Sequence, residues 1–97
     1  MTFRSPKLLR SAEGQPCTIC GVNDGTTVAA HANSVELGKG VGIKVPDFYT
    51  AILCSVCHAL LDGRIGKLTK DEKWEMWVTA YLRTVKRWFT DGVVVVK

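Results

Sequence analysis

Long apolar runs are missing from the chain. Charged residues interrupt each of the longer apolar stretches, whereas a membrane-spanning helix needs about 20 consecutive, predominantly apolar residues. An apolar export segment is also missing, because Met1-Thr2-Phe3-Arg4 is polar and Pro6 follows soon after. We therefore expect a cytoplasmic protein with reduced thiols and no membrane partner. Repeats and low-complexity tracts are absent as well.

Strong charge of either sign is also lacking. The 97 residues carry 13 Lys and Arg against 9 Asp and Glu, which gives a formal net charge of +4. This mild basic bias permits a polyanionic partner without requiring one. A chain of this length forms one small domain. Such a domain buries only about two-thirds of its unfolded surface, so an internal cross-link is expected.

Cysteine is sparse, but its spacing is specific. The four cysteines form two Cys-x-x-Cys pairs, Cys17/Cys20 and Cys54/Cys57, with none left over. Two such pairs predict one tetrahedral Zn²⁺ site, and disulfides are the competing interpretation. Gly21 is the small residue that the tight turn after Cys20 requires. Four cysteine ligands close a zinc site, so catalysis would have to come from side chains outside it.

Histidine occurs only twice, and each copy adjoins a segment that the zinc would fix. If the segment after Cys57 is helical, His58 and Asp62 share one face of that helix. Histidine is the side chain best suited to proton transfer near neutral pH, so His31 suits a general base, whereas His58 and Asp62 together suit a metal ion. The alternatives are structural. His31 is then a buried hydrogen-bonded residue, His58 merely neighbours the zinc, and Asp62 is a cap or a surface acid.

The segments before the second cysteine pair are expected to be short. Residues 7–12 form one or two helical turns or a solvated arm. Residues 26–30, rich in Thr and Ala, predict a strand that delivers the first histidine at its end. Residues 38–44 carry glycine at alternate positions, which excludes a stable helix and leaves a flexible connector or a loop that contacts phosphate. Asp47 caps a short helix or precedes a strand over residues 49–53.

A long helix is expected near the end of the chain. A shorter helix over residues 57–61 comes first and ends at Gly63. Thr69 and Glu72 then make a capping box, and the long helix runs to about Trp88. Its apolar face predicts core or a dimer surface, with stacking on bases as the less favoured alternative. That face consists of Trp74, Trp77, Val78, Tyr81, Leu82, Val85 and Trp88.

Two further features of the C-terminal part complete the prediction. Four basic residues of the long helix are expected to face water: Lys73, Arg83, Lys86 and Arg87. The turn signal Asp91-Gly92 leads into residues 93–96, a valine run that predicts a short strand at a sheet edge.

A family resemblance rests on five strings of residues. They are Ala30-His31-Ala32-Asn33, Gly38-Lys39-Gly40, Lys44-Val45-Pro46-Asp47, Leu53-Cys54-x-x-Cys57-His58 and Asp62-Gly63-Arg64. Ala30-His31 at the end of a strand, followed after a variable loop by Leu53-Cys54-x-x-Cys57-His58, resembles the HNH, or ββα-metal, endonuclease motif in its zinc-stabilised form. All five strings together are more similar still to the small nucleases of lambdoid phages and prophages, the YbcO-like family. The resemblance covers residues 14–66 well and the C-terminal helix loosely.

The resemblance implies roles for the residues outside the zinc site. It makes His31 the general base and His58 a ligand of a catalytic divalent ion, with Asp62 where HNH enzymes often carry a second ligand. HNH enzymes usually place a further ligand just before the base, where this chain has Ala30. The Asn that orients the base in HNH enzymes would fall near Tyr49, where none exists. The candidate substitutes for that Asn are Asp47 and Asn33.

The expected fold is α+β, a small zinc-stabilised ββα-metal (HNH-like) domain with a long C-terminal helix and a short terminal strand. Residues 1–97 make one domain, with an arm over 1–14, a zinc core over 15–66 and the helix and strand over 67–97.

The expected function is metal-dependent cleavage of DNA by a phage- or prophage-encoded enzyme. His31 takes a proton from water, and an ion such as Mg²⁺ on His58 and Asp62 stabilises the leaving oxygen. Three basic residues are candidates for contacts to the DNA backbone: Lys39, Lys44 and Arg64. The alternative is a non-catalytic zinc-ribbon-like module that binds DNA or a partner protein. A dithiol redox protein is disfavoured, because neither cysteine pair opens a helix in a βαβ context. The tryptophan-bearing helix leaves room for a homodimer.

Overall fold

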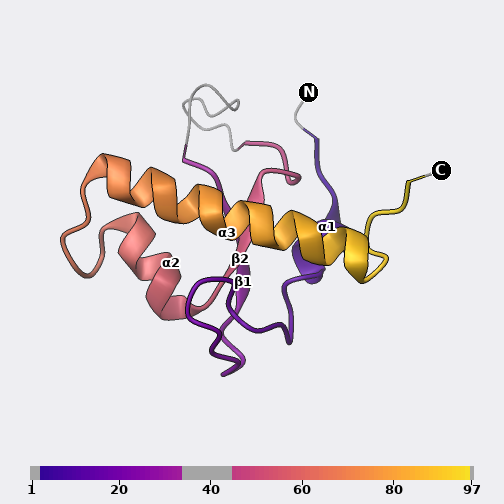
Figure 1. Ribbon diagram of the computed structural model, residues 1–97, viewed down its shortest axis with the longest axis horizontal. Coiled ribbons are helices and arrows are strands. Elements are labelled where there is room, and N and C mark those ends of the chain that lie inside the picture. Colours follow the sequence, from indigo (N-terminus) through magenta and orange to yellow (C-terminus); the bar gives the residue numbers. More distant parts are fainter. Residues whose placement is uncertain (1–2, 34–44, 97) are drawn as a thin grey trace.

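A two-stranded antiparallel hairpin lies at the centre of the molecule (Figure 1). The computed structural model describes residues 3–33 and 45–96. Strand β1 spans Val28–His31 and β2 spans Thr50–Leu53, and Val28 pairs with Leu53 while His31 pairs with Thr50. This register places His31 at the opposite end of the hairpin from the cysteine that follows Leu53. The small α+β fold agrees with the prediction.

Three helices surround the hairpin: α1 (Pro6–Arg10), α2 (Ser55–Asp62) and α3 (Lys70–Thr90). The side chain of Ser5 caps α1, and Gly63 ends α2 with a left-handed φ of 75°, a conformation that favours glycine. The capping box at Thr69 and Glu72 opens α3 as the sequence predicts. Helix α3 runs across the strands and covers one face of the hairpin (Figure 1).

The buried face of α3 is narrower than the predicted apolar face. It consists of Trp77, Ala80, Thr84 and Trp88. Trp74 and Leu82 were predicted on this face but are 45% and 63% exposed, so for these two residues the core interpretation is wrong and the dimer surface stays a prediction. The buried face is narrow because small side chains of α3 line the centre of its contact with β2. Ala80 and Thr84 let the helix approach β2 closely enough for the Thr84 hydroxyl to accept a hydrogen bond from the Ile52 amide at 2.9 Å.

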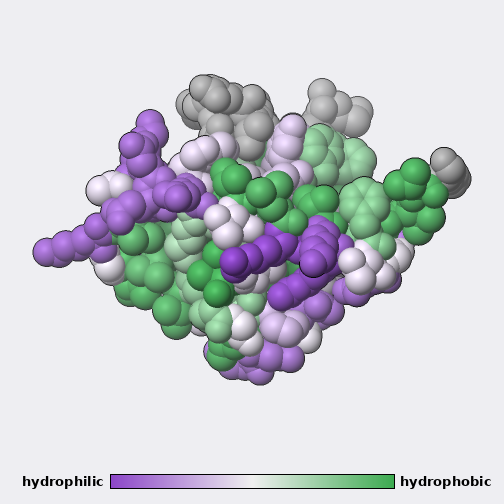
Figure 2. Space-filling view, viewed as in Figure 1, coloured by the Kyte–Doolittle hydropathy of each residue, from purple (hydrophilic) through white to green (hydrophobic). Residues whose placement is uncertain are grey.

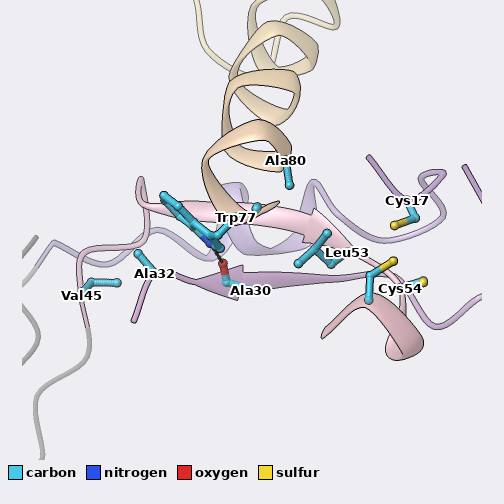
Figure 3. Close-up of a cluster of buried hydrophobic side chains, with 10 residues drawn as sticks. Cys17, Ala30, Ala32, Val45, Leu53, Cys54, Trp77 and Ala80 are labelled. Atoms are coloured by element: carbon cyan, nitrogen blue, oxygen red, sulfur yellow. Dashed lines mark hydrogen bonds between the residues drawn. The ribbon is translucent and has the colours of Figure 1, made fainter. Parts of the chain in front are cut away.

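The buried tryptophans of α3 belong to the core. The Trp77 indole lies over the hairpin and donates a hydrogen bond to the Ala30 carbonyl at 3.1 Å (Figure 3). The Trp88 indole donates to the Ser11 hydroxyl at 2.9 Å, which ties α3 to the segment that follows α1. Because both rings are buried, they cannot stack on the bases of a nucleic acid. The core interpretation is therefore confirmed for these two residues.

The predicted C-terminal strand does not form. Residues 93–96 lie outside the two-stranded sheet of the described chain, and the amides of Val93 and Val94 donate to the Trp88 carbonyl. The outer edge of β2 is already occupied, because the Ile52 carbonyl accepts from the Thr18 amide and the Ile52 amide donates to Thr84. A valine run has the propensity for a strand, but at β2 it finds no unpaired edge.

Candidate metal centre and active site

The four cysteine sulfurs meet at one end of the hairpin (Figure 3 labels Cys17 and Cys54). Cys17 and Cys20 lie on a tight turn in which the Gly21 amide donates to the Cys17 carbonyl and Gly21 has a φ of 77°. Cys54 follows β2, and Cys57 lies in the first turn of α2. All four sulfurs lie within 4.8 Å of one another, and those of Cys20 and Cys54 are 3.6 Å apart. They form the only cluster of three or more candidate ligands among the described residues.

This geometry fits a tetrahedral metal ion. Four sulfurs at about 2.3 Å from a central zinc would lie about 3.8 Å from each other. The cluster can therefore hold a metal ion such as zinc. Three of the cysteines are buried and Cys20 is exposed, so the ion would lie close to the surface.

The electrostatics of the thiols also favour a cation. Burial raises the pKa of the Cys17 thiol, but hydrogen bonds from the backbone at Cys20, Cys54 and Ile19 outweigh it and lower that pKa to about 6. Burial and the neighbouring Cys17 sulfur raise the pKa of the Cys57 thiol far above its ordinary value. The Cys17 thiolate thus forms easily, whereas the Cys57 thiol resists ionisation because it is buried beside the Cys17 sulfur. A divalent cation bound by the sulfurs would offset the repulsion between neighbouring thiolates.

The first histidine makes a short contact with a buried carboxylate. His31 Nε2, at the end of β1, lies 2.8 Å from Asp47 Oδ1. The Asp47 side chain is only 2% exposed. It also accepts hydrogen bonds from the N-terminal arm, from the Ser5 amide at 2.6 Å and from Arg4 Nη1 at 3.0 Å. Burial would raise the pKa of Asp47, but its hydrogen bonds with His31, Ser5 and Arg4 hold that pKa below its ordinary value.

Asp47 and Asn33 were the two candidates for orienting the histidine. The structure places the Asp47 carboxylate in contact with the His31 ring, and the orienting role itself stays a prediction. The strand register explains this contact: His31 pairs with Thr50, and the Thr50 hydroxyl donates to the Asp47 carbonyl at 2.9 Å. Asp47 lies 16 positions after His31, and the pairing of the two strands brings them together. The sequence alone did not predict this contact because it did not define the strand register.

The second histidine and Asp62 lie on one face of α2, as their spacing predicts. His58 Nε2 and Asp62 Oδ2 are 3.5 Å apart, and the side chains are 32% and 46% exposed. Two ligand atoms at about 2.1 Å from one ion are separated by about 3.0–3.4 Å, so this pair fits an ion after a small adjustment. Arg64 Nη2 already lies 3.1 Å from Asp62 Oδ2. Arg64 therefore competes with a metal ion for this carboxylate.

Both histidines open onto the same groove, which has a volume of about 980 Å³. Asp62 lies in its wall as well, as do Ala30 and Asn33. The cysteine cluster is not among the lining residues, so the metal centre and the groove are separate sites. Arg64 does not line the groove either. Lys39 and Lys44 lie outside the described residues.

Of the four basic residues of α3 that were predicted to face water, Arg83 and Lys86 are exposed, whereas Lys73 and Arg87 are partly buried. Arg83 donates to the Thr18 carbonyl at 2.7 Å, and Arg87 donates to the Pro16 carbonyl. These two side chains hold the first cysteine turn against α3. Lys73 lies in the wall of the groove together with Lys70, which the sequence analysis did not single out.

Comparison with known proteins places these features in context. The family model described as "Putative nuclease YbcO" matches residues 6–93. A solved structure, described as "Structure of a putative bacteriophage protein from Escherichia coli str. K-12 substr. MG1655", is similar over 88% of this chain and 99% of that chain, with 28% sequence identity and a TM-score of 0.65. No curated protein matches. Within residues 3–33 and 45–96, no helix has the length and apolar character needed to cross a bilayer.

Proposed function

Since the chain belongs to the YbcO family, we propose that it is a metal-dependent endonuclease of the HNH-like class that hydrolyses phosphodiester bonds in DNA. One observation carries the proposal. A single groove contains both imidazoles of the chain and the Asp62 carboxylate, while a separate cluster of four thiols supplies the structural metal site. Hydrolysis of a phosphodiester needs a base for water and a cation for the leaving oxygen, and the groove offers candidates for both.

His31 is the proposed general base. An ionised Asp47 accepts a hydrogen bond from Nε2–H of His31 and so fixes the tautomer in which Nδ1 is free of hydrogen. Nδ1 can then take the proton from the attacking water. Arg4 and the Ser5 amide keep Asp47 ionised and in place, so the N-terminal arm takes part in orienting the base. The ring is 24% exposed, which leaves it accessible from the groove.

His58 and Asp62 are the proposed ligands of the catalytic ion, which is Mg²⁺ or a similar divalent cation. Such an ion supplies positive charge that stabilises the oxygen leaving the phosphorus. Only these two side chains are proposed as protein ligands, since Ala30 occupies the position where HNH enzymes usually have another. Asp62 has to leave Arg64 to bind the ion. This exchange costs little, because an ion pair at so exposed a position contributes at most about 1 kcal/mol.

The competing function is a non-catalytic zinc module that binds DNA or protein. Ala30 favours it, because the groove then offers fewer ligands than an HNH enzyme usually has. The Asp47–His31 pair favours catalysis, because a purely structural module has no use for a partly exposed imidazole fixed by a buried carboxylate.

Plasmid nicking tests the proposed function. The zinc-loaded protein is incubated with supercoiled plasmid and with Mg²⁺, Mn²⁺ or Ni²⁺ in turn. We expect nicking that requires one of these ions and is strongly reduced in Asp62→Asn. The matched control is Asp91→Asn, which removes an exposed carboxylate at the C-terminal end of α3, outside the groove. DNA binding without cleavage under any ion would favour the non-catalytic module.

A further inference from the structure

Two lysines of α3 lie in the wall of the groove that holds the histidines. Helix α3 begins beside α2, and Figure 2 shows hydrophilic side chains protruding at this end of the molecule. Lys70 and Lys73 are one turn apart on the first part of α3, and both line the groove with His31, His58 and Asp62. Residues three apart share a helix face, so the two ammonium groups enter the groove from the same side.

The Lys73 side chain lies against the end of α2. A Cβ atom added at Gly63 would lie 3.1 Å from Lys73 Nζ, so the ammonium lies against the left-handed turn that ends α2. The negative end of the α2 dipole attracts a cation there. Lys73 is partly buried, whereas Lys70 and Lys86 on the same helix are exposed.

Neither ammonium forms an ion pair with a carboxylate among the described residues, although Glu13 and Asp62 also line the groove. The ion pairs of the described chain involve Arg4, His31, His58 and Arg64 on the basic side. The arginines further along α3 are engaged with the backbone carbonyls of the first cysteine turn. Two like charges at this spacing repel each other. An anion bound between or beside the two ammonium groups would offset this repulsion.

We propose that Lys70 and Lys73 bind the phosphates of the substrate strand and hold its backbone in the groove beside the scissile bond. This inference rests on the proposed nuclease function and adds to it the residues that position the nucleic acid. The ligand is a nucleic-acid backbone because a phosphodiester chain offers successive anions to two ammonium groups one helical turn apart. These lysines contact no base, so they strengthen binding without selecting a sequence.

Salt-dependent DNA binding tests the inference. Fluorescence anisotropy with a labelled DNA duplex gives the Kd of the zinc-loaded protein at several salt concentrations, without an added divalent ion, so that no cleavage occurs. The double variant Lys70→Ala/Lys73→Ala should bind more weakly, and the slope of log Kd against log salt should fall by about two, one for each lost phosphate contact. The control is Lys7→Ala/Lys86→Ala, which removes the same two charges from exposed positions outside the groove.

Running the nicking assay on the same proteins separates a failure of the lysine proposal from a failure of the nuclease proposal. A slope and Kd equal to those of the control double variant would overturn the inference, and nicking by the wild type would then leave the nuclease proposal standing. If the slope falls in the lysine double variant but the wild type does not nick DNA, the phosphate-binding role of the lysines is supported and the nuclease proposal is rejected. If the wild type binds no DNA, both proposals are wrong. Lys73→Arg should keep the wild-type slope, because it keeps the charge.

Discussion

The sharpest prediction concerns the carboxylate of Asp47. The substitution Asp47→Asn keeps the size of the side chain and removes its charge. In the wild type, the two oxygens accept hydrogen bonds from Ser5 and Arg4 and contact His31 Nε2. The asparagine has only one carbonyl oxygen, and its amide nitrogen is itself a donor. At least one of the three partners therefore loses its acceptor.

The structure sets the size of both expected effects. The Asp47 side chain is 2% exposed, so a donor left without a partner there costs about 1–3 kcal/mol of unfolding free energy. Arg4 is 45% exposed and water replaces much of its contact, so Ser5 and His31 dominate the loss. The substitution is also expected to reduce activity, because a His31 ring held in the wrong tautomer cannot act as a general base. That action typically contributes about 10²–10⁴-fold, and the corresponding change in a Ser-His-Asp triad costs about 10⁴-fold.

The assay measures the nicking rate at saturating DNA and metal ion, well below the melting temperature of the variant. We expect a rate reduced by about 10²-fold or more, with DNA affinity and zinc content unchanged. Asp91→Asn is the control for removing an acidic side chain and should behave as wild type. A rate within about threefold of wild type in Asp47→Asn would refute the role assigned to this carboxylate.

Three further predictions concern stability. Removal of zinc by a chelator should unfold the domain, because a structural zinc site contributes about 10 kcal/mol or more to folding; unchanged far-UV circular dichroism after complete removal would contradict this. Because the pKa of Asp47 is lowered by folding, its contribution is fully present above its unfolded pKa of about 3.9 and is lost as pH falls through the lower folded pKa. Urea unfolding should therefore show a steeper loss of stability below pH 4 in the wild type than in Asp47→Asn, and equal pH slopes would count against the pairing. Thr84→Val leaves the buried Ile52 amide without an acceptor and should cost about 1–3 kcal/mol in urea unfolding. Thr79→Val, in which the lost hydroxyl bonds only within its own helix, should cost less, and equal losses would argue against the contact between α3 and β2.

Local signals in the sequence predict much of this structure. The turn at Gly21, the cap at Gly63 and the capping box at Thr69 each depend on neighbouring residues alone, and all three are present. The clustering of the four cysteines also follows from their spacing, because a shared metal demands it. The turn and the two caps are predictable because no distant contact decides them, and the cysteine cluster is predictable because one metal ion would bring the two distant pairs together.

Features that depend on tertiary pairing were predicted less well. The valine run at the C-terminus has strand propensity, but the edge of β2 is occupied by Thr18 and Thr84. Lys70 and Lys73 line the groove because of the way α3 packs beside α2. The pattern of residues along one helix does not predict how it packs against another. The partner of His31 likewise follows from the hairpin register and from an N-terminal arm more than forty positions away from Asp47 along the chain.

The nicking rate of His31→Ala tests the central claim most directly. The wild type and the variant are compared at equal zinc content, with saturating Mn²⁺ and supercoiled plasmid. We expect the variant to lose about 10²–10⁴-fold in rate while its affinity for DNA stays within twofold of the wild type. Equal rates for the two proteins would show that the imidazole at the end of β1 does not activate water.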